Sequence, residues 1–201
     1  MSPDKFGDSY DIVKRDIIQW LACPAEWASH PMCWGGDHSF VADYTRFLGI
    51  DLASGDTSRR NSVVPVGRAC PRHLFLDPHT GLRPHHQGPT DSLWSHVTIG
   101  ELAQIADGPD RASKLTLVYD QGYQRPTNEE RNGLAQEKLE SLWRDHKVHG
   151  VAYVSHVAFI WVSKDKNLLA DATKRLLNRS GLPRSRFVDD ECGRNHRGQP
   201  E

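Results

Sequence analysis

The sequence predicts an α/β fold: a three-layer sandwich in which helices cover both faces of a mainly parallel sheet, with a hairpin near the C-terminus. Two compact apolar runs, residues 74–76 and 115–119, have the length and composition of strands buried on both faces. Amphipathic helical patterns lie before, between and after these runs. A third apolar run, residues 151–163, is too long for one average strand and is most simply a hairpin.

The composition bounds the organisation of the chain. At 201 residues it is expected to form one α/β domain over residues 1–188, followed by a mobile polar tail over 189–201. The formal net charge of −1 gives no global attraction to nucleic acid or anionic membrane, so any nucleic-acid contact must be local. We find no apolar segment of signal-peptide or membrane-spanning length and no Cys-x-x-Cys pair, which predicts a cytoplasmic protein with reduced thiols and no membrane partner.

The first helix is expected to begin after Asp8 and to end at Pro24. Asp8 is placed as an N-cap, and Asp11 lies in the first turn, where the helix dipole favours a carboxylate. Both acids can therefore be structural. The alternative is that they line a site together with Lys14 and Arg15, which one helical turn brings within reach of Asp11. The apolar stripe consists of Tyr10, Val13, Ile17, Trp20 and Leu21.

The next stretch contains a weaker strand signal and a clear helix. Residues 26–36 are expected to form a first strand that ends at the Gly35-Gly36 turn. A helix is predicted over residues 40–48, with Gly49 as its C-cap. Residues 51–72 are expected to form a loop or an edge strand.

The apolar run at residues 74–76 leads directly to a group of polar residues. Pro78 and Gly81 end the predicted strand, so Asp77 lies at its carboxyl end. Ligands of open α/β sheets bind at that edge, which makes Asp77 and His79 candidates for chemistry. The following loop carries His85, a candidate for handling substrate. The alternative is that Asp77 only caps the turn.

The second buried strand also ends in a carboxylate, Asp120. If the two strands are adjacent and parallel, Asp77 and Asp120 lie side by side at one edge of the sheet; otherwise each acid caps its own loop. A capping box from Thr98 to Glu101 predicts a helix before this strand, and a long amphipathic helix is expected over residues 127–147.

The C-terminal part is predicted to contain the hairpin and one more helix. The hairpin is expected to turn near Ser155 and His156. Asn167 is the expected cap of a last helix that runs to Leu177, and Gly181 ends it.

The order of the predicted elements and two short stretches carry a resemblance to methyltransferases. The order strand, helix, strand, long helix and hairpin from residue 73 onward resembles the second half of a class I Rossmann-like methyltransferase. Asp77-Pro78 resembles the start of the Asp-Pro-Pro-Tyr motif of the adenine-N6 methyltransferases, with His79-Thr80 at the Pro-Tyr positions. Residues 7–14, Gly-Asp-Ser-Tyr-Asp-Ile-Val-Lys, are similar to the entry helix of the 23S rRNA adenine-N6 methyltransferase family.

Two further resemblances involve the same motif. Residues 76–82, together with 117–121 and Arg125, resemble uncharacterised bacterial and phage-borne proteins with an Asp-Pro-Asp-x-Gly motif. These likenesses imply a Rossmann-like sandwich, although the glycine-rich loop that holds S-adenosylmethionine has no counterpart before residue 73. Residues 76–82 also resemble in outline the Asp-x-Asp-Gly-Thr signature of haloacid dehalogenase-type phosphatases, with His79 in place of the second Asp.

The first functional hypothesis is a nuclease-like, metal-dependent enzyme that hydrolyses nucleic-acid phosphodiesters. Carboxylates would hold Mg²⁺ or Mn²⁺, and a metal-bound water would attack the phosphorus in line. We expect Asp77 and Asp120 to hold the metal. Asp8 or Asp11 would complete the site.

The remaining roles in this hypothesis fall to basic and polar side chains. His156 or His79 would transfer a proton, because a histidine pKa lies near the working pH. Lys14 and Arg125 would neutralise the charge that develops on the phosphate. Contacts to the substrate are assigned to Arg15, Gln121 and His85.

The second hypothesis is a module that keeps the methyltransferase scaffold without the cofactor. Such a module would bind nucleic acid, a protein partner or a second copy of the chain, because a fold does not fix a function. Its enzymatic variant is an S-adenosylmethionine-dependent methyltransferase in which Asp77-Pro78 orients an exocyclic amine. Convergence of Asp8, Asp77, Asp120 and His156 would favour the metal enzyme.

Overall fold

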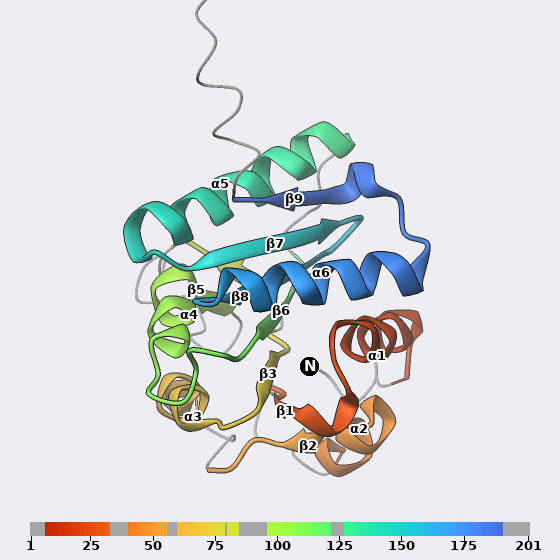
Figure 1. Cartoon of the computed structure of the whole chain (residues 1–201). Coiled ribbons are helices and arrows are strands. Elements are labelled where there is room, and N and C mark those ends of the chain that lie inside the picture. The colour runs from red at the N-terminus through yellow and green to blue at the C-terminus, as the bar shows by residue number, and fades with distance from the viewer. Residues whose placement is uncertain are drawn as a thin grey trace, which may run out of the picture.

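The computed structural model describes residues 7–32, 40–55, 60–78, 80–84, 96–121 and 127–190. The elements alternate between helices and strands along most of the chain (Figure 1). In order they are α1 (Ser9–Leu21), η2 (Pro24–Glu26), β1 (Trp27–His30), α2 (Val41–Leu48), β2 (Asp51–Leu52), η3 (Arg60–Ser62), α3 (Val63–Ala69), β3 (His73–Leu76), β4 (Gly81–Arg83), β5 (His96–Thr98), α4 (Ile99–Ala106), β6 (Thr116–Asp120), α5 (Asn128–His146), β7 (His149–Val154), β8 (Ala158–Ser163), α6 (Lys166–Ser180), η4 (Arg184–Arg186) and β9 (Phe187–Asp189).

Within the described ranges, seven strands form one mixed sheet in the order β2-β1-β3-β6-β8-β7-β9. The strands β2, β1, β3 and β6 are parallel, whereas β8 runs antiparallel to both β6 and β7. β9 pairs antiparallel with β7 at one edge, and β4 and β5 form a separate parallel pair. The predicted α/β fold, with a largely parallel sheet and a hairpin near the C-terminus, is therefore confirmed.

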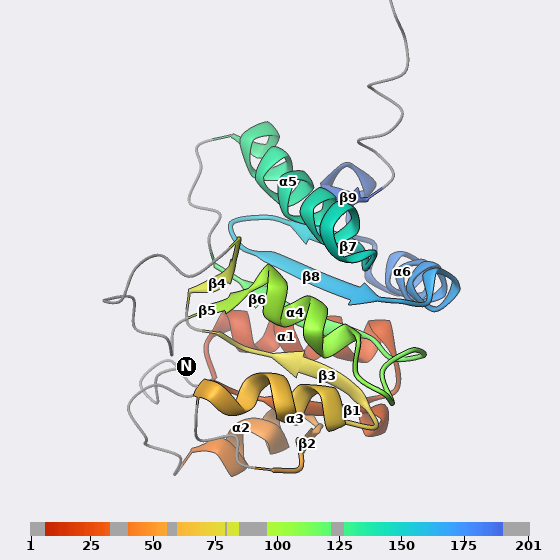
Figure 2. The same ribbon diagram turned by 90° about the vertical axis from the view of Figure 1, so that its left-hand side faces the viewer.

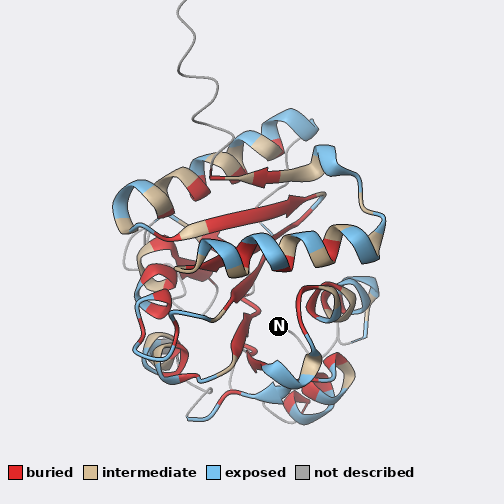
Figure 3. Cartoon of the chain, in the orientation of Figure 1, coloured by how far each residue is buried: buried red, intermediate tan, exposed pale blue. Residues whose placement is uncertain are grey.

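Helices cover both faces of the sheet, which gives the three layers (Figures 1 and 2). One apolar core joins the sheet to α3, α4 and α5, and a second joins the opposite face to α1, α2 and α6. Side chains along β3 alternate between them: Leu74 and Leu76 belong to the first core and Phe75 to the second. The central strands are buried throughout, while the helices expose their outer faces (Figure 3).

Several local predictions are confirmed at the ends of helices. Asp8 caps α1 by accepting hydrogen bonds from the backbone N–H groups of Tyr10 and Asp11. The capping box from Thr98 to Glu101 opens α4, and Gly49 ends α2 with a φ of 73°. The hairpin turns at residues 155–157 between β7 and β8, as the sequence predicts.

Other expectations differ from the structure. Residues 63–69 form the helix α3 where a loop or an edge strand was expected. The last helix is capped by Asp165 rather than Asn167, and it continues to Ser180. The predicted tail contributes Asp189 to the edge strand β9, and residues 191–201 lie outside the described part of the chain. Among the described helices, none is both long and apolar enough to span a membrane.

The sheet contains a topological switch point between β1 and β3. From β1 the chain passes through α2 to β2 on one side, and from β3 it passes through α4 to β6 on the other side. In open α/β sheets, ligands bind in the crevice outside the carboxyl ends of the strands at such a point. The backbone N–H of Asp77 donates to the carbonyl oxygen of His30 at 3.4 Å, which ties the carboxyl ends of β3 and β1 together.

The buried His73 at the start of β3 is expected to make the stability of the protein depend on pH in the acid range. His73 is buried, and its Nδ1 accepts a hydrogen bond of 3.0 Å from the backbone N–H of Leu115. Burial lowers the pKa of His73 from 6.5 to about 4, although the charge of Glu26 opposes the shift. Below pH 6.5, His73 therefore binds a proton in the unfolded chain but stays neutral in the folded chain until the pH falls to about 4. The contribution of His73 is complete above pH 6.5 and is lost as the pH falls to about 4, a loss of up to about 3 kcal/mol.

The substitution His73→Gln tests this, because the amide oxygen of glutamine can accept the same N–H without titrating. We expect the free energy of unfolding of the wild type to fall more steeply between pH 7 and pH 4 than that of His73→Gln, measured by urea denaturation. Parallel curves would show that His73 is not responsible.

Candidate functional site

The two strand-end carboxylates lie at one edge of the sheet but on opposite faces. β3 and β6 are adjacent and parallel, as the prediction required, and Leu76 lies opposite Val118. The next residue, Asp77, is therefore level with Tyr119, and Asp120 lies one residue further along. Because successive side chains of a strand alternate between faces, Asp77 points to the α1, α2 and α6 side and Asp120 to the α3, α4 and α5 side.

Asp77 belongs to a buried polar cluster that also contains residues of α1 and α2. The Lys14 Nζ lies 3.0 Å from Asp11 Oδ1 and 3.0 Å from Asp77 Oδ2. The Tyr44 hydroxyl donates to the same Asp77 Oδ2 at 2.6 Å. The side chain of Tyr119 completes the group, because the Lys14 ammonium lies 4.3 Å from the centre of its ring. These five residues are called the Lys14 cluster below.

The Lys14 cluster is shielded from solvent, and its lysine stays charged. Asp11, Lys14 and Asp77 are 2%, 5% and 2% exposed. Burial alone would lower the pKa of Lys14, but the carboxylates of Asp77 and Asp11 outweigh this effect and raise it above its ordinary value. Burial, followed by the negative charge of Asp77, raises the pKa of Tyr119, so this phenol stays protonated. The cluster is therefore a pair of carboxylates held around one ammonium ion.

The sequence of α1 explains how the cluster is assembled. The cap at Asp8 fixes the first turn, and the three-residue spacing of Asp11 and Lys14 brings them to the same side of the helix. The backbone N–H of Gly7 donates to Asp11 Oδ2 at 2.8 Å, so both oxygens of this carboxylate are bound. Tyr10 packs near Tyr119 with ring centres 6.2 Å apart and remains 43% exposed.

On the opposite face, Asp120 forms a separate buried ion pair. The Lys138 Nζ of α5 lies 2.6 Å from Asp120 Oδ2, and the backbone N–H of Leu82 donates to Asp120 Oδ1 at 3.1 Å. Gly81 has a φ of +89°, and a Cβ there would lie 2.0 Å from the same Oδ1. Asp120 thus connects β6 with α5 and the start of β4.

The remaining candidate residues lie apart from the Lys14 cluster or outside the described residues. His156 is exposed in the β7–β8 turn, at the same edge of the sheet as Asp77 and Asp120, because Ala158 pairs with Asp120. Arg15 lies with its guanidinium 5.1 Å from the Phe47 ring, and Gln121 is exposed after β6. The predicted residues His79, His85 and Arg125 lie outside the described part of the chain.

The structure thus brings together Asp11, Lys14 and Asp77 and leaves Asp120 and its partner on the other face. Asp8 serves as the cap at the start of α1. No group of three or more histidine, cysteine, aspartate or glutamate side chains among the described residues could hold a metal ion. A metal site shared by Asp77 and Asp120 is therefore not supported by the geometry.

Sequence reasoning missed Tyr44, Tyr119 and Lys138 as polar partners. Tyr44 and Tyr119 were counted as apolar positions of a helix and a strand. Lys138 interrupts the buried stripe of α5, because it lies three residues after Ala135 and four before Leu142. A charge at such a position was the one available signal, since a buried lysine requires a partner.

Comparisons with known proteins give no relative for this chain. Neither a protein-family model, a curated protein nor a solved structure matches the sequence.

Proposed function

We propose that this chain binds S-adenosylmethionine at the switch point between β1 and β3 and transfers a methyl group to an amino nitrogen of a nucleic-acid base. One observation carries the proposal: Asp77 is fixed through a single carboxylate oxygen. Its Oδ2 accepts from Lys14 and Tyr44, whereas no hydrogen bond joins Oδ1 to another described residue. A carboxylate oriented in this way can accept a hydrogen bond from an incoming N–H group.

The scaffold supports the same assignment. Asp77-Pro78 follows β3 at the switch point, where ligands of open α/β sheets bind. From β3 to β8, apart from the separate pair β4 and β5 inserted after β3, the elements follow the order strand, helix, strand, long helix and hairpin for which the sequence resembles a class I methyltransferase.

The Lys14 cluster has a definite task in this chemistry. S-adenosylmethionine, when bound, supplies an electrophilic methyl group. Lys14 forms an ion pair with Asp77, and Tyr44 fixes the direction of the carboxylate. Asp77 can then align an amino group through its N–H, which leaves the nitrogen lone pair directed at the methyl carbon, and it can accept the proton that the nitrogen loses. Lys14 and Tyr44 are positioning residues, and Asp77 is the group that touches the substrate.

A metal-dependent phosphodiesterase is the second candidate, and one observation favours it. Asp11 and Asp77, both predicted to be metal ligands, converge on one cationic centre, the Lys14 ammonium. Mg²⁺ prefers carboxylate oxygens and is often held by one or two of them with phosphate and water. A displaced Lys14 would leave such a pair of ligands. Asp120 has no part in this arrangement.

The test is ligand-dependent thermal stability, measured with S-adenosylmethionine and separately with Mg²⁺ and Mn²⁺. At a ligand concentration of about 100 Kd, we expect S-adenosylmethionine to raise the melting temperature of the wild type by roughly 5–10 °C. Asp77→Asn is expected to keep part of this shift but to lose methyl transfer to RNA and DNA oligonucleotides, because its amide cannot act as the anionic acceptor.

Asp120→Asn is the matched control, because it also removes a buried aspartate–lysine pair at the end of a neighbouring strand. It is expected to cost similar stability and to retain both the shift and the transfer. A shift with Mg²⁺ or Mn²⁺ that Asp77→Asn abolishes, with none from S-adenosylmethionine, would overturn methyl transfer in favour of the phosphodiesterase. If none of the three ligands changes the melting temperature, both enzymatic assignments are contradicted.

A further inference from the structure

The region formed by α6 and η4 carries a positive charge that the rest of the chain does not. Residues 164–186 contain seven lysines and arginines and two aspartates, a local net charge of +5. The whole chain has a net charge of −1, so the other residues together are acidic. A polyanion would therefore be attracted to this region and repelled by the remainder of the protein.

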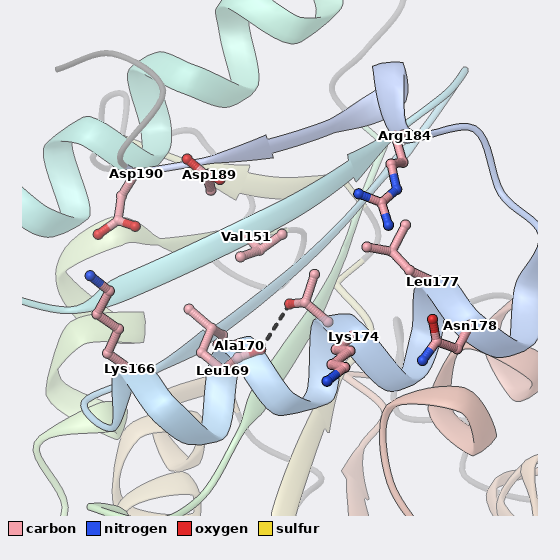
Figure 4. Close-up of a pocket in the computed structure, with 11 residues that line it drawn as sticks. Val151, Lys166, Leu169, Ala170, Lys174, Leu177, Asn178, Arg184, Asp189 and Asp190 are labelled. Atoms are coloured by element: carbon pink, nitrogen blue, oxygen red, sulfur yellow. Dashed lines mark hydrogen bonds between the residues drawn. The ribbon is translucent and has the colours of Figure 1, made fainter. Parts of the chain in front are cut away.

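Three cations of this region, Lys166, Lys174 and Arg184, line a groove on the protein surface. The groove has a volume of about 460 Å³ and lies between α6 and the strands β7 and β9 (Figure 4). Figure 4 shows Arg184 and Leu177 at one end of the groove and Lys166 and Asp190 at the other. Val151 and Leu169 supply apolar contact area in the groove. The five cations Lys166, Lys174, Arg179, Arg184 and Arg186 are called the α6 basic surface below.

The charges of the α6 basic surface are only partly balanced by neighbouring groups. In the described part of the chain, neither Lys174 nor Arg184 forms an ion pair, and both side chains are exposed. The two acids within residues 164–186 do not cancel them: Asp165 accepts the backbone N–H groups that open α6, and Asp171 is exposed on its own. Two acids, Asp189 and Asp190, also line the groove and offset part of its positive charge. Asp190 is buried, and its Oδ2 lies 2.9 Å from His149 Nδ1.

The position of α6 relates this surface to the Lys14 cluster. α6 packs against α1, the helix that carries Asp11 and Lys14. Arg175 Nε donates to the carbonyl oxygen of Leu21 at 3.0 Å, and Arg179 donates to that of Gln19 at 3.3 Å. A long ligand seated on α6 would therefore lie beside the helix that supplies Asp11 and Lys14 to the cluster.

We propose that the α6 basic surface binds the phosphate backbone of a nucleic acid and presents one of its bases to the Lys14 cluster. Charge complementarity selects this partner, because lysine and arginine side chains supply the sequence-independent part of nucleic-acid affinity. The apolar residues of the groove suit the sugars and bases that accompany the phosphates. The inference rests on the proposed function for the fate of the base, whereas the binding step stands on the surface alone.

The experiment measures binding without any cofactor, so its failure can be told apart from failure of the proposed function. A short fluorescein-labelled single-stranded RNA of mixed sequence, and the DNA of the same sequence, are titrated with the wild type and with the double variant Lys174→Glu/Arg184→Glu. Fluorescence anisotropy at several salt concentrations gives the affinity and its salt dependence. The double variant is expected to bind at least tenfold more weakly at low salt. Its slope of log K against log[salt] is expected to be shallower by about 1.4, since each lost contact removes about 0.7.

The matched control is Arg46→Glu/Arg144→Glu, which makes the same change in net charge at exposed arginines of α2 and α5. We expect the affinity of this control for RNA to lie within about twofold of that of the wild type. The comparison is made at high salt, where the effect of net charge on the affinity is screened. An equal loss in both double variants, no loss in the first, or no binding by the wild type would overturn the proposal. Competition by polyglutamate as effective as that by unlabelled RNA would also overturn it, because the surface would then select charge and not nucleic acid.

Discussion

Replacing Lys14 by methionine is expected to lower the free energy of unfolding by about 3–5 kcal/mol, the usual cost of breaking a buried ion pair by removing one partner. Methionine fills much of the same volume, so the loss comes from charge and not from a cavity. Asp11 and Asp77, each 3% exposed at the side chain, would then face each other without the ammonium that separates them. Urea denaturation followed by tryptophan fluorescence measures the effect.

Two comparisons identify the origin of this loss. Lys174→Met, on the exposed side of α6, is the matched control and is expected to change the stability by less than about 0.5 kcal/mol. In the double variant Lys14→Met/Asp77→Asn, part of the loss should be recovered, because one uncompensated charge has gone. A loss below about 1 kcal/mol for Lys14→Met would show that water reaches the cluster.

The Lys14 cluster also fixes the response to alkali. The pKa of Lys14 is raised in the folded chain, so its stabilising contribution is complete below its ordinary value of 10.5 and is lost as the pH rises through the folded value. The wild type should therefore lose more stability above pH 10.5 than Lys14→Met does.

The second large effect is expected for Arg111→Met, with a loss of about 3–6 kcal/mol. The Arg111 guanidinium is buried, and it donates to the carbonyl oxygens of Cys70, Arg72 and Leu115 and to the Thr116 hydroxyl. Methionine would remove these donors from the carbonyl oxygens of Cys70 and Arg72, at about 1–3 kcal/mol for each buried group that stays unsatisfied, whereas the Leu115 oxygen still accepts from the backbone N–H of Leu74.

The control for this variant is Arg68→Met on α3, since Arg68 is only half-buried and donates to one backbone oxygen, that of Gln104, at 3.3 Å. Thermal denaturation should show a melting temperature roughly 6–15 °C lower for Arg111→Met and nearly unchanged for Arg68→Met. Equal stability of the two variants would mean that water replaces the lost donors.

The strand-end acids show how far the sequence could lead to the site. The apolar runs before Asp77 and Asp120 correctly predicted two buried strands, each ending in a carboxylate. The faces to which these acids point depend on register, and register is set by pairing between strands that are distant in sequence. Leu76 pairs with Val118, and a shift of one residue would have brought the acids to the same face. No local pattern contains that information.

The helix α3 illustrates a second kind of limit. Val63, Val64 and Gly67 have low helix propensity, so residues 63–69 did not resemble a helix. Pro65 lies in the first turn, where it costs no hydrogen bond. Burial of Val63 and Val66 in the core shared with α4 stabilises the helix in spite of its composition. Tertiary packing decided this element, as it also decided that Tyr44 would reach Asp77.

The position of β8 has a consequence for the order in which the protein can fold. β8 follows β7 in the chain but lies between β6 and β7 in the sheet, so β7 has no strand partner on that side until β8 is present. Adjacent strands of a hairpin pair within microseconds because the loop between them is short. The hairpin should therefore form first and dock as a unit onto β6. On the ribosome, β8 can cover the edge of β6 only after Ser163 has emerged, and until then β6 exposes an open edge that a chaperone or a second nascent chain could occupy.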